Sequence, residues 1–413
     1  MKNFGIKATL YLNYFVFAIL LNSVGIVILK SQNIYGVDEV AASTLELFKD
    51  LPIAIVSFII ASFLPRIGYK NAMLTGLFLV TIGSIQMYFM NSFLGARILF
   101  AMVGVSFALI KISVYSLIGL VAKGQKEHNS LMSSIEGVFM IGIALAYFLF
   151  PAFNNENNPN SWLNVYWLLA AISTLSFIIL VYTKFDEGHE IPGKDLIDDA
   201  KQMMLLLTKI FVLVFIISAF LFVMVEQGIM TWLPTFNSRV LKLPENVGIM
   251  MASILAISLA VGRLTAGLIT KYVSWVYVVI VCTIIAMLIL VLILPSAIGI
   301  TVVEINSITD IPLIGFVFPL VGLFIAPIYP LLNSAILSVL PNKLHSPMTG
   351  LIVIFSALGG TLGSRIIGWL FKNVGADTAF YYILIPMAML IIAFIILNRL
   401  TNKMALDKAK SSN

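Results

Sequence analysis

Residues 97–121 read Arg97-Ile-Leu-Phe-Ala-Met-Val-Gly-Val-Ser-Phe-Ala-Leu-Ile-Lys111-Ile-Ser-Val-Tyr-Ser-Leu-Ile-Gly-Leu-Val121. A helix of this length crosses a bilayer, because roughly 20 apolar residues span the hydrocarbon layer. Lys111 falls near the middle of the run, where a lysine costs about 2.5–3.5 kcal/mol to insert. A charged residue at that depth usually faces a bundle interior or a water-filled cavity, so Lys111 is a candidate functional residue. The alternative is a lysine that a buried carboxylate neutralises only to fix helix packing.

Composition indicates a polytopic membrane protein. Of the 413 residues, 60% are hydrophobic and 11% are charged, whereas soluble domains average about 25% charged residues. The single cysteine, Cys282, provides no disulfide or metal framework, and no histidine falls in a predicted span. We therefore expect no metal site and no other cofactor.

The basic residues follow a topological pattern. One set of loops and the two tails hold Lys2, Lys7, Arg66, Lys70, Lys123, Lys126, Lys184, Lys194, Lys201, Lys271, Lys343, Arg399, Lys403, Lys408 and Lys410. The opposite loops hold only Lys30, Arg239, Lys242 and Lys372, with Arg97 at a helix start. Positive loops stay in the cytoplasm, so we expect both termini inside and an even number of spans. The net charge of +6 then reflects topology, and no nucleic-acid partner is expected. We expect a multi-pass monomer in the lipid bilayer of a bacterial inner membrane.

Twelve apolar runs, each bounded by polar or Gly/Pro-containing turns, predict an all-α protein. They cover residues 8–29, 42–64, 71–90, 96–121, 131–153, 163–183, 208–233, 247–269, 275–295, 312–340, 347–372 and 378–400. The most charged stretch separates them into an N-terminal six-helix bundle (1–183), a cytoplasmic linker (184–207) and a C-terminal six-helix bundle (208–413). Within the linker, Ile191-Pro192-Gly193 breaks the chain, and the residues from Lys194 to about Leu206 have the spacing of an amphipathic surface helix.

Two six-helix halves, a cytoplasmic linker and internal termini resemble the major facilitator superfamily. The signature loop of that family, Gly-x-x-x-Asp-Arg/Lys-x-Gly-Arg/Lys-Arg/Lys, corresponds to Ala61-Ser-Phe-Leu-Pro65-Arg66-Ile-Gly68-Tyr69-Lys70, in which the first glycine and the aspartate are missing. The equivalent place in the second half reads Gly267-Leu-Ile-Thr-Lys271-Tyr-Val-Ser274, after Gly262-Arg263. Such an internal echo is typical of a duplicated transporter fold. The resemblance implies two pseudo-repeats, with spans one, four, seven and ten around a central cavity.

Within the superfamily the chain looks most like the fucose–galactose–glucose:proton symporter branch. The similar stretches are Ala42 to Met73, Glu226-Gln-Gly-Ile-Met-Thr-Trp232-Leu-Pro234, and Tyr329-Pro330 followed by Gly359-Gly360. Lys111 replaces a carboxylate of that branch in span four, and Asn22 and Ser23 stand where it has an aspartate in span one. The proton-coupling chemistry of that branch therefore does not transfer directly.

Eight charged residues fall inside predicted spans. They are Glu46, Lys49, Asp50, Lys111, Glu136, Glu226, Arg263 and Arg365. The i, i+3, i+4 spacing of the first three places them on one helix face, where Lys49 either pairs or reaches the outer headgroups. Distances along each span place Glu226 and Arg365 in the outer half of the membrane and Glu136 and Arg263 nearer the cytoplasm.

Lys111 and Glu226 are the charged residues that we expect to meet a solute. Polar groups that complete the candidate pocket are Tyr14, Asn22, Tyr115, Gln227, Trp232, Tyr329 and Asn333. Membrane-interface anchoring is the competing interpretation for Trp232, and a structural charge pair or helix cap is the favoured interpretation for Arg263. The run Gly359-Gly360-Thr361-Leu362-Gly363 predicts close helix packing.

The leading hypothesis is a secondary active transporter for a small polar solute, a sugar or sugar-like compound, working by alternating access between the two halves. Asp50, Glu136 and Glu226 are the candidate proton carriers, with Asp50 slightly favoured over Glu226, because apolar surroundings raise the pKa of a carboxylate. Sodium is the alternative coupling ion. Arg66 and Lys70 are expected to form a cytoplasmic gate against span eleven or span four. The alternatives are a transporter of carboxylate-bearing anions, which Lys111 favours, drug efflux, and a receptor or scaffold; an enzyme is not expected, because no catalytic constellation is present.

Overall fold

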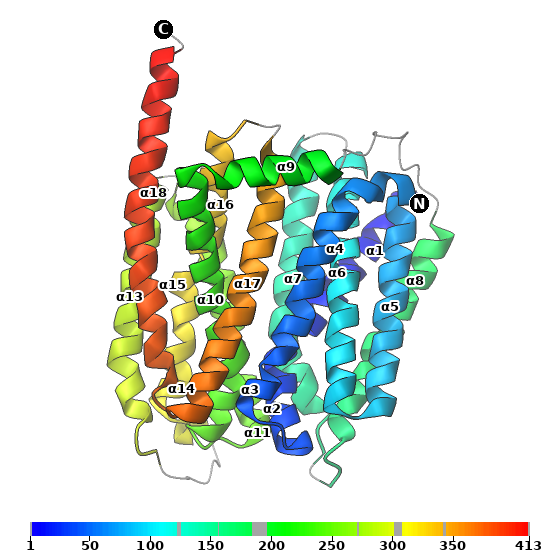
Figure 1. The fold of residues 1–413 in the computed structure, drawn as a ribbon. Helices are drawn as coiled ribbons and strands as arrows, with labels where there is room; N and C mark the ends of the chain where they lie inside the picture. Colours follow the sequence, from blue (N-terminus) through cyan, green and yellow to red (C-terminus); the bar gives the residue numbers. More distant parts are fainter. Residues whose placement is uncertain are drawn as a thin grey trace. The chain divides into compact units, whose positions relative to one another are not determined.

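The computed structural model describes residues 2–121, 125–155, 157–183, 196–270, 272–300, 308–341 and 344–411. The chain divides into two compact units, Met1–Leu196 and Ile197–Asn413, which we call the N-terminal and C-terminal units. The division falls inside the segment 184–207 that the sequence analysis assigns to a linker. Each unit is a bundle of helices (Figure 1).

The N-terminal unit is built from membrane-length helices joined by short turns. Its helices are α1 (Lys2–Asn22), α2 (Val24–Tyr35), α3 (Glu39–Ala42), α4 (Thr44–Ile67), α5 (Tyr69–Met90), α6 (Phe93–Val121), α7 (Gln125–Ala152), η1 (Ser161–Asn164) and α8 (Val165–Tyr182). In this unit α6 packs against α4 and α5, whereas α1 packs against α7 and α8.

The C-terminal unit has more broken helices. They are α9 (Leu196–Leu207), α10 (Ile210–Arg239), α11 (Glu245–Met251), α12 (Ser253–Ile269), α13 (Trp275–Ile293), η2 (Leu294–Ala297), η3 (Ile308–Asp310), α14 (Leu313–Val317), η4 (Phe318–Leu320), α15 (Val321–Ile325), α16 (Ile328–Val339), α17 (His345–Asn373), η6 (Ala379–Ile383) and α18 (Leu384–Ser411). The long helix α10 packs against α17 and α18, and α9 lies crosswise to α10 at one end of the unit (Figure 1).

The predicted membrane spans are confirmed as helices. Within the described residues, 11 segments are long and apolar enough to cross a membrane. The continuous 24-residue helix α4 lies at the remaining predicted span and completes the twelve. The protein is therefore an all-α polytopic membrane protein.

Several predicted spans are divided rather than continuous, spans one, eight and ten among them. Span one breaks at Ser23 between α1 and α2, where the Ser23 hydroxyl donates to the carbonyl of Leu20 at 2.8 Å. The Asn22 side chain also donates to the backbone, at the carbonyl of Ala18 and 2.8 Å. Span ten is split into α14, η4, α15 and α16. Prolines interrupt it, because a proline removes one helical hydrogen bond and clashes with the preceding turn.

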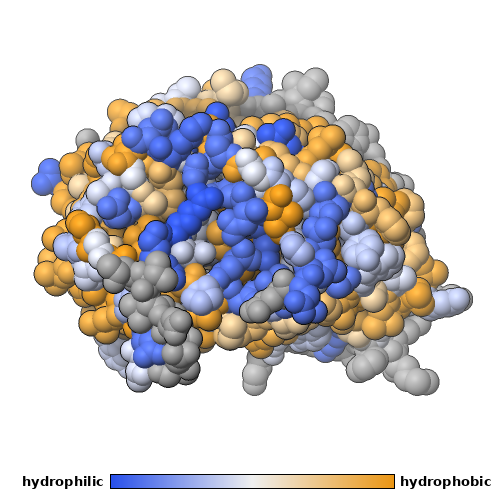
Figure 2. Space-filling model, turned by 90° about the horizontal axis from the view of Figure 1, so that it is seen from below, coloured by the Kyte–Doolittle hydropathy of each residue, from blue (hydrophilic) through white to orange (hydrophobic). Residues whose placement is uncertain are grey.

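Apolar side chains cover the flanks of both units. Large hydrophobic residues such as Phe89 and Ile141 in the N-terminal unit, and Leu264 and Leu292 in the C-terminal unit, are exposed. In the end-on view of Figure 2, hydrophobic residues occupy the outer edges and hydrophilic residues gather inside them. This distribution matches helices that are surrounded by lipid along their length and by water at their ends.

Glycines allow α17 to approach α10 closely. A Cβ atom added at Gly359 would collide with the carbonyl oxygen of Phe220, and one added at Gly363 would collide with that of Met224. The two glycines are four residues apart, which is the spacing of small residues at tight membrane-helix contacts. The glycine run in span eleven therefore serves helix packing.

We expect Gly363→Ala to lower the free energy of unfolding by about 1–3 kcal/mol, the usual cost of overpacking. Gly267→Ala is the matched control, since an added Cβ atom there meets nothing within 4 Å. The control should be neutral or slightly stabilising, because alanine favours helices more than glycine by about 1 kcal/mol. Thermal unfolding of the two purified variants measures the difference, and equal midpoints would contradict the close contact.

Candidate functional site

Lys111 lies among aromatic rings of the N-terminal unit. Its Nζ atom is 5.5 Å from the centroid of Phe107 and 6.0 Å from that of Tyr115. These residues are one helical turn before and after Lys111 on α6, so all three share one face of the helix. An ammonium within about 6 Å of a ring centroid is attracted by the ring quadrupole.

The aromatic environment extends to α1 and α7. Tyr14 on α1 lies 6.3 Å from Tyr115 and packs edge-on against Phe139 of α7, with centroids 5.7 Å apart. Phe107 in turn contacts Phe139, at 6.2 Å, and Phe17 of α1, at 5.9 Å. We call Tyr14, Phe17, Phe107, Tyr115 and Phe139 the aromatic cluster.

Glu136 joins this cluster through a hydrogen bond. The Tyr115 hydroxyl donates to Glu136 Oε1 at 2.7 Å. Tyr115 therefore contacts both the ammonium-bearing side chain of Lys111 and the carboxylate of Glu136. Glu136 is thus connected to Lys111 through a shared tyrosine.

Lys111, Tyr115 and Glu136 are partly exposed rather than buried. Lys111 is also about 15 Å from the end of α6 at Val121, because a helix rises 1.5 Å per residue. A charged group this deep is costly against lipid. We call Lys111, Tyr115 and Glu136 the polar edge of the aromatic cluster. This edge is therefore suited to contact with water or a polar solute.

Asp50 is part of a charge group on α4. Lys49 Nζ lies 2.5 Å from Glu46 Oε2 and 3.4 Å from Asp50 Oδ1. Glu46, Lys49 and Asp50 are only 1%, 4% and 9% exposed. The shared helix face is confirmed, and Lys49 pairs within the protein instead of reaching the headgroups.

In the C-terminal unit, Glu226 of α10 pairs with Arg263 of α12. Arg263 donates from Nη2 to Glu226 Oε1 at 3.1 Å. This contact brings together the charged groups of two residues that the sequence places at different depths along their spans. Counting along a span ignores helix tilt and the length of an arginine side chain.

A second aromatic group accompanies this ion pair. Tyr329 of α16 stacks on Phe222 of α10, with centroids 5.7 Å apart, and its hydroxyl is 3.2 Å from the hydroxyl of Ser356 on α17. Asn333, one turn after Tyr329, has a buried Oδ1 atom without a hydrogen-bond partner among the described residues. The Tyr329 ring thus offers a face for stacking, and Asn333 Oδ1 offers a hydrogen-bond acceptor.

Other predicted site residues have different surroundings. Trp232 is completely buried and donates its indole N–H to the carbonyl of Ser364 on α17 at 2.8 Å, so here it supports helix packing. Asn22 is engaged with its own helix, as described above. Gln227 is partly exposed on α10.

Of the two predicted gate residues, Arg66 and Lys70, the structure describes the side-chain contacts of Lys70. Lys70 donates to the carbonyls of Val181 and Thr183, each at 2.9 Å, and so contacts the end of α8 within its own unit. The side chain of Arg66 lies outside the described residues. Arg365 is exposed on α17.

Four phenylalanines of these sites are absent from the sequence-based site: Phe17, which follows Tyr14 by three residues, Phe107, Phe139 and Phe222. Phe107 and Phe222 precede Lys111 and Glu226 by four residues, and Phe139 follows Glu136 by three. Helical neighbours at these spacings share a face. This spacing is the signal that could have found them.

Arg263→Gln is expected to lower the free energy of unfolding by about 1–3 kcal/mol, because it leaves the Glu226 carboxylate without its charge partner. The lower half of this range applies, since the Arg263 side chain is 34% exposed. The double variant Glu226→Gln/Arg263→Gln should regain most of the loss. Thermal unfolding in detergent tests this, with the exposed Arg365→Gln as control; a double variant no more stable than Arg263→Gln would refute the pairing energy.

Comparison with known proteins relates this architecture to a known family. The family model described as Major Facilitator Superfamily matches residues 10–321. No curated protein sequence matches the chain.

Solved structures similar to the chain include several transporters. A D-xylose-proton symporter is 16% identical, with a TM-score of 0.68 over 96% of this chain and 97% of that one. A POT family transporter in complex with 5-aminolevulinic acid is 14% identical, with a TM-score of 0.74 over 96% of each chain. FucP, a transporter in the outward conformation, is 14% identical, with a TM-score of 0.62 over 95% of this chain and 98% of that one. At such identities the likeness shows the fold, and together with the family match it identifies the chain as a member of the major facilitator superfamily.

Proposed function

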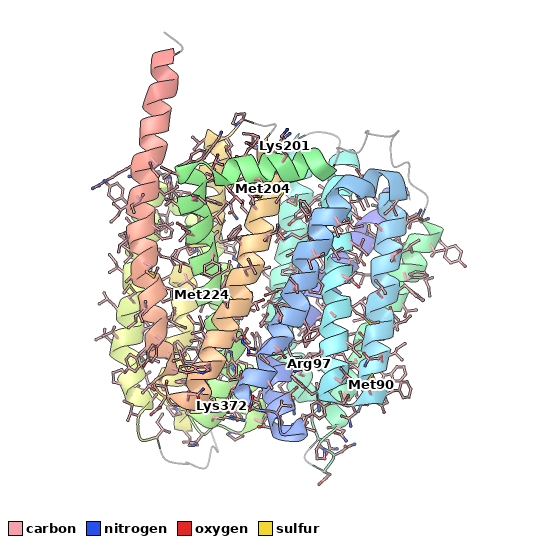
Figure 3. The ribbon with its side chains drawn as sticks, in the orientation of Figure 1. Met90, Arg97, Lys201, Met204, Met224 and Lys372 are labelled. Carbon is pink, nitrogen blue, oxygen red and sulfur yellow. The ribbon has the colours of Figure 1, made fainter. Side chains whose placement is uncertain are left out.

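We propose that this protein is a secondary active transporter that moves a small polar solute by alternating access and is driven by protons. The solute of first choice is a sugar or sugar-like compound. Both termini would face the cytoplasm of a bacterial inner membrane. The sequence assigns Lys201 to the cytoplasmic side and Lys372 to the opposite side. Their positions at opposite ends of the C-terminal unit (Figure 3) support this assignment.

The polar edge of the aromatic cluster carries the proposal. It combines Lys111, Tyr115 and Glu136, which are partly exposed residues of membrane-spanning helices and bring an ammonium, a phenol and a carboxylate together. A purely structural protein has little reason to keep charged groups exposed at this depth, given the cost of placing them against lipid.

The aromatic cluster favours a sugar as solute. Ring faces and a few hydrogen-bonding groups are the elements that bind and orient small polar ligands, and Tyr14, Tyr115 and Glu136 supply both kinds of contact. Lys111 favours the second candidate, a solute with a carboxylate, because an ammonium pairs with it directly. Aromatic rings would also suit drug efflux, but the charges of Lys111 and Glu136 favour a polar solute.

Uptake by purified protein in proteoliposomes tests the proposal. Neutral sugars, acidic sugars and small organic acids are offered under an imposed pH gradient, with and without sodium. Accumulation of a neutral sugar supports the first solute class, and accumulation of only the acidic compounds supports the second. A protein that is folded but transports none of these solutes, under either ion gradient, would contradict the proposal.

A further inference from the structure

A groove of about 490 Å³ runs along the C-terminal unit between α10, α17 and the start of α18. Its volume is within the range of about 300–1,000 Å³ that ligand pockets occupy. Met224 of α10, Ile366 and Trp369 of α17, and Ile385 and Met389 of α18 form its walls. None of its lining residues carries a charge, so a polar solute would lose hydrogen bonds there.

One end of the groove has a different character. Trp369 and Tyr382, which line it, are 51% and 43% exposed. Lys372 follows within one turn of Trp369, in the last turn of α17, and is exposed. Tryptophan and tyrosine gather where hydrocarbon meets headgroups. This end therefore has the composition of a membrane interface.

The other end lies deeper along the helices. Figure 3 shows Lys372 at the end of the unit opposite α9 and Met224 well inside its length. From Asn373 back to Gly363, which also lines the groove, α17 covers about 15 Å at 1.5 Å per residue. The groove thus runs from a basic, aromatic mouth into an apolar interior, parallel to the helices.

We propose that this groove binds one acyl chain of an anionic phospholipid, whose phosphate is held at Lys372. The gradient along the groove matches that of a lipid, with a charged head at the interface and a chain that runs inwards. Ile366, Ile385 and Met389 are exposed, and along the flank of a membrane helix the contacting medium is lipid. Leu221, Met224 and Val225 of α10 line the groove, whereas Glu226 does not. The proposed lipid site is therefore distinct from the Glu226–Arg263 pair and does not depend on the transported solute.

Quenching of tryptophan fluorescence tests the proposal. The full-length protein in detergent is titrated with phosphatidylglycerol or phosphatidylcholine that carries brominated acyl chains. The part of the quenching that disappears in Trp369→Phe reports on the groove. Lys372→Gln should weaken this part about fivefold for phosphatidylglycerol, the contribution of one basic residue near an anionic headgroup, and should leave phosphatidylcholine unchanged.

Two matched variants separate the groove from the general lipid surface. Met389→Phe adds volume inside the groove and should remove the Trp369-dependent quenching. Ile392→Phe changes an exposed residue of the same helix that does not line the groove, and should preserve it. No Trp369-dependent quenching by either lipid, equal effects of the two phenylalanine variants, or an unchanged phosphatidylglycerol titration in Lys372→Gln would each overturn the assignment.

Discussion

Lys111→Met is expected to lower the catalytic efficiency of solute uptake by about 10- to 150-fold, the effect of removing a hydrogen bond to a charged group. Methionine keeps the length and apolar stem of the side chain and removes the ammonium that lies over Phe107 and Tyr115. A lysine that only fixed packing would be replaced without loss of transport, since methionine is far less costly inside a membrane. The uptake rate in proteoliposomes at matched protein density measures the effect.

The kinetic pattern shows what Lys111 contacts. If it binds a carboxylate on the solute, the loss appears mainly in KM, whereas a role in setting the state of Glu136 lowers kcat. Lys111→Arg, which keeps a positive charge, should retain part of the activity. Lys209→Gln changes an exposed lysine at the start of α10 and is the control for nonspecific charge effects. Normal uptake by Lys111→Met would exclude a direct role for this residue.

The fold could be predicted because lipid imposes simple requirements on a chain. Each span must be long, apolar and helical so that its backbone groups are hydrogen-bonded internally. The spacing of Glu46, Lys49 and Asp50 likewise determined their shared face, and the spacing of Gly359 and Gly363 their tight contact with α10. These features depend only on local helix geometry.

Contacts between helices were harder to predict. The pairing of Glu226 with Arg263 requires the relative level and rotation of α10 and α12, which hydrophobic length does not specify. The break at Ser23 depends on whether two side chains bond to their own backbone, and the same residues also occur inside continuous helices. The chain has 29 phenylalanines, so nothing in their number distinguishes Phe107 or Phe139 from residues that face lipid.

The contacts of the three candidate proton carriers now differ. Lys49 lies 3.4 Å from Asp50 and Arg263 lies 3.1 Å from Glu226. Each of these two acids is therefore already in contact with a cation of its own unit in this conformation. Glu136 instead accepts a hydrogen bond from the neutral phenol of Tyr115 at 2.7 Å. We therefore propose Glu136, rather than Asp50, as the proton carrier.

Glu136→Gln should abolish uphill accumulation of solute under a pH gradient while preserving exchange of labelled for unlabelled solute. Glutamine keeps an oxygen that can accept the Tyr115 hydrogen bond but cannot bind and release a proton, so the conformational cycle continues without coupling. A gradient of one pH unit supplies about 1.4 kcal/mol per proton. With one proton per solute, the wild type should therefore accumulate the solute about tenfold, whereas the variant should reach a ratio of internal to external solute near one. Asp50→Asn and Glu226→Gln are the comparison variants, expected to keep part of the coupled uptake if folded. Full accumulation by Glu136→Gln would reject Glu136 as the carrier, and accumulation that follows a sodium gradient in the wild type would reject proton coupling itself.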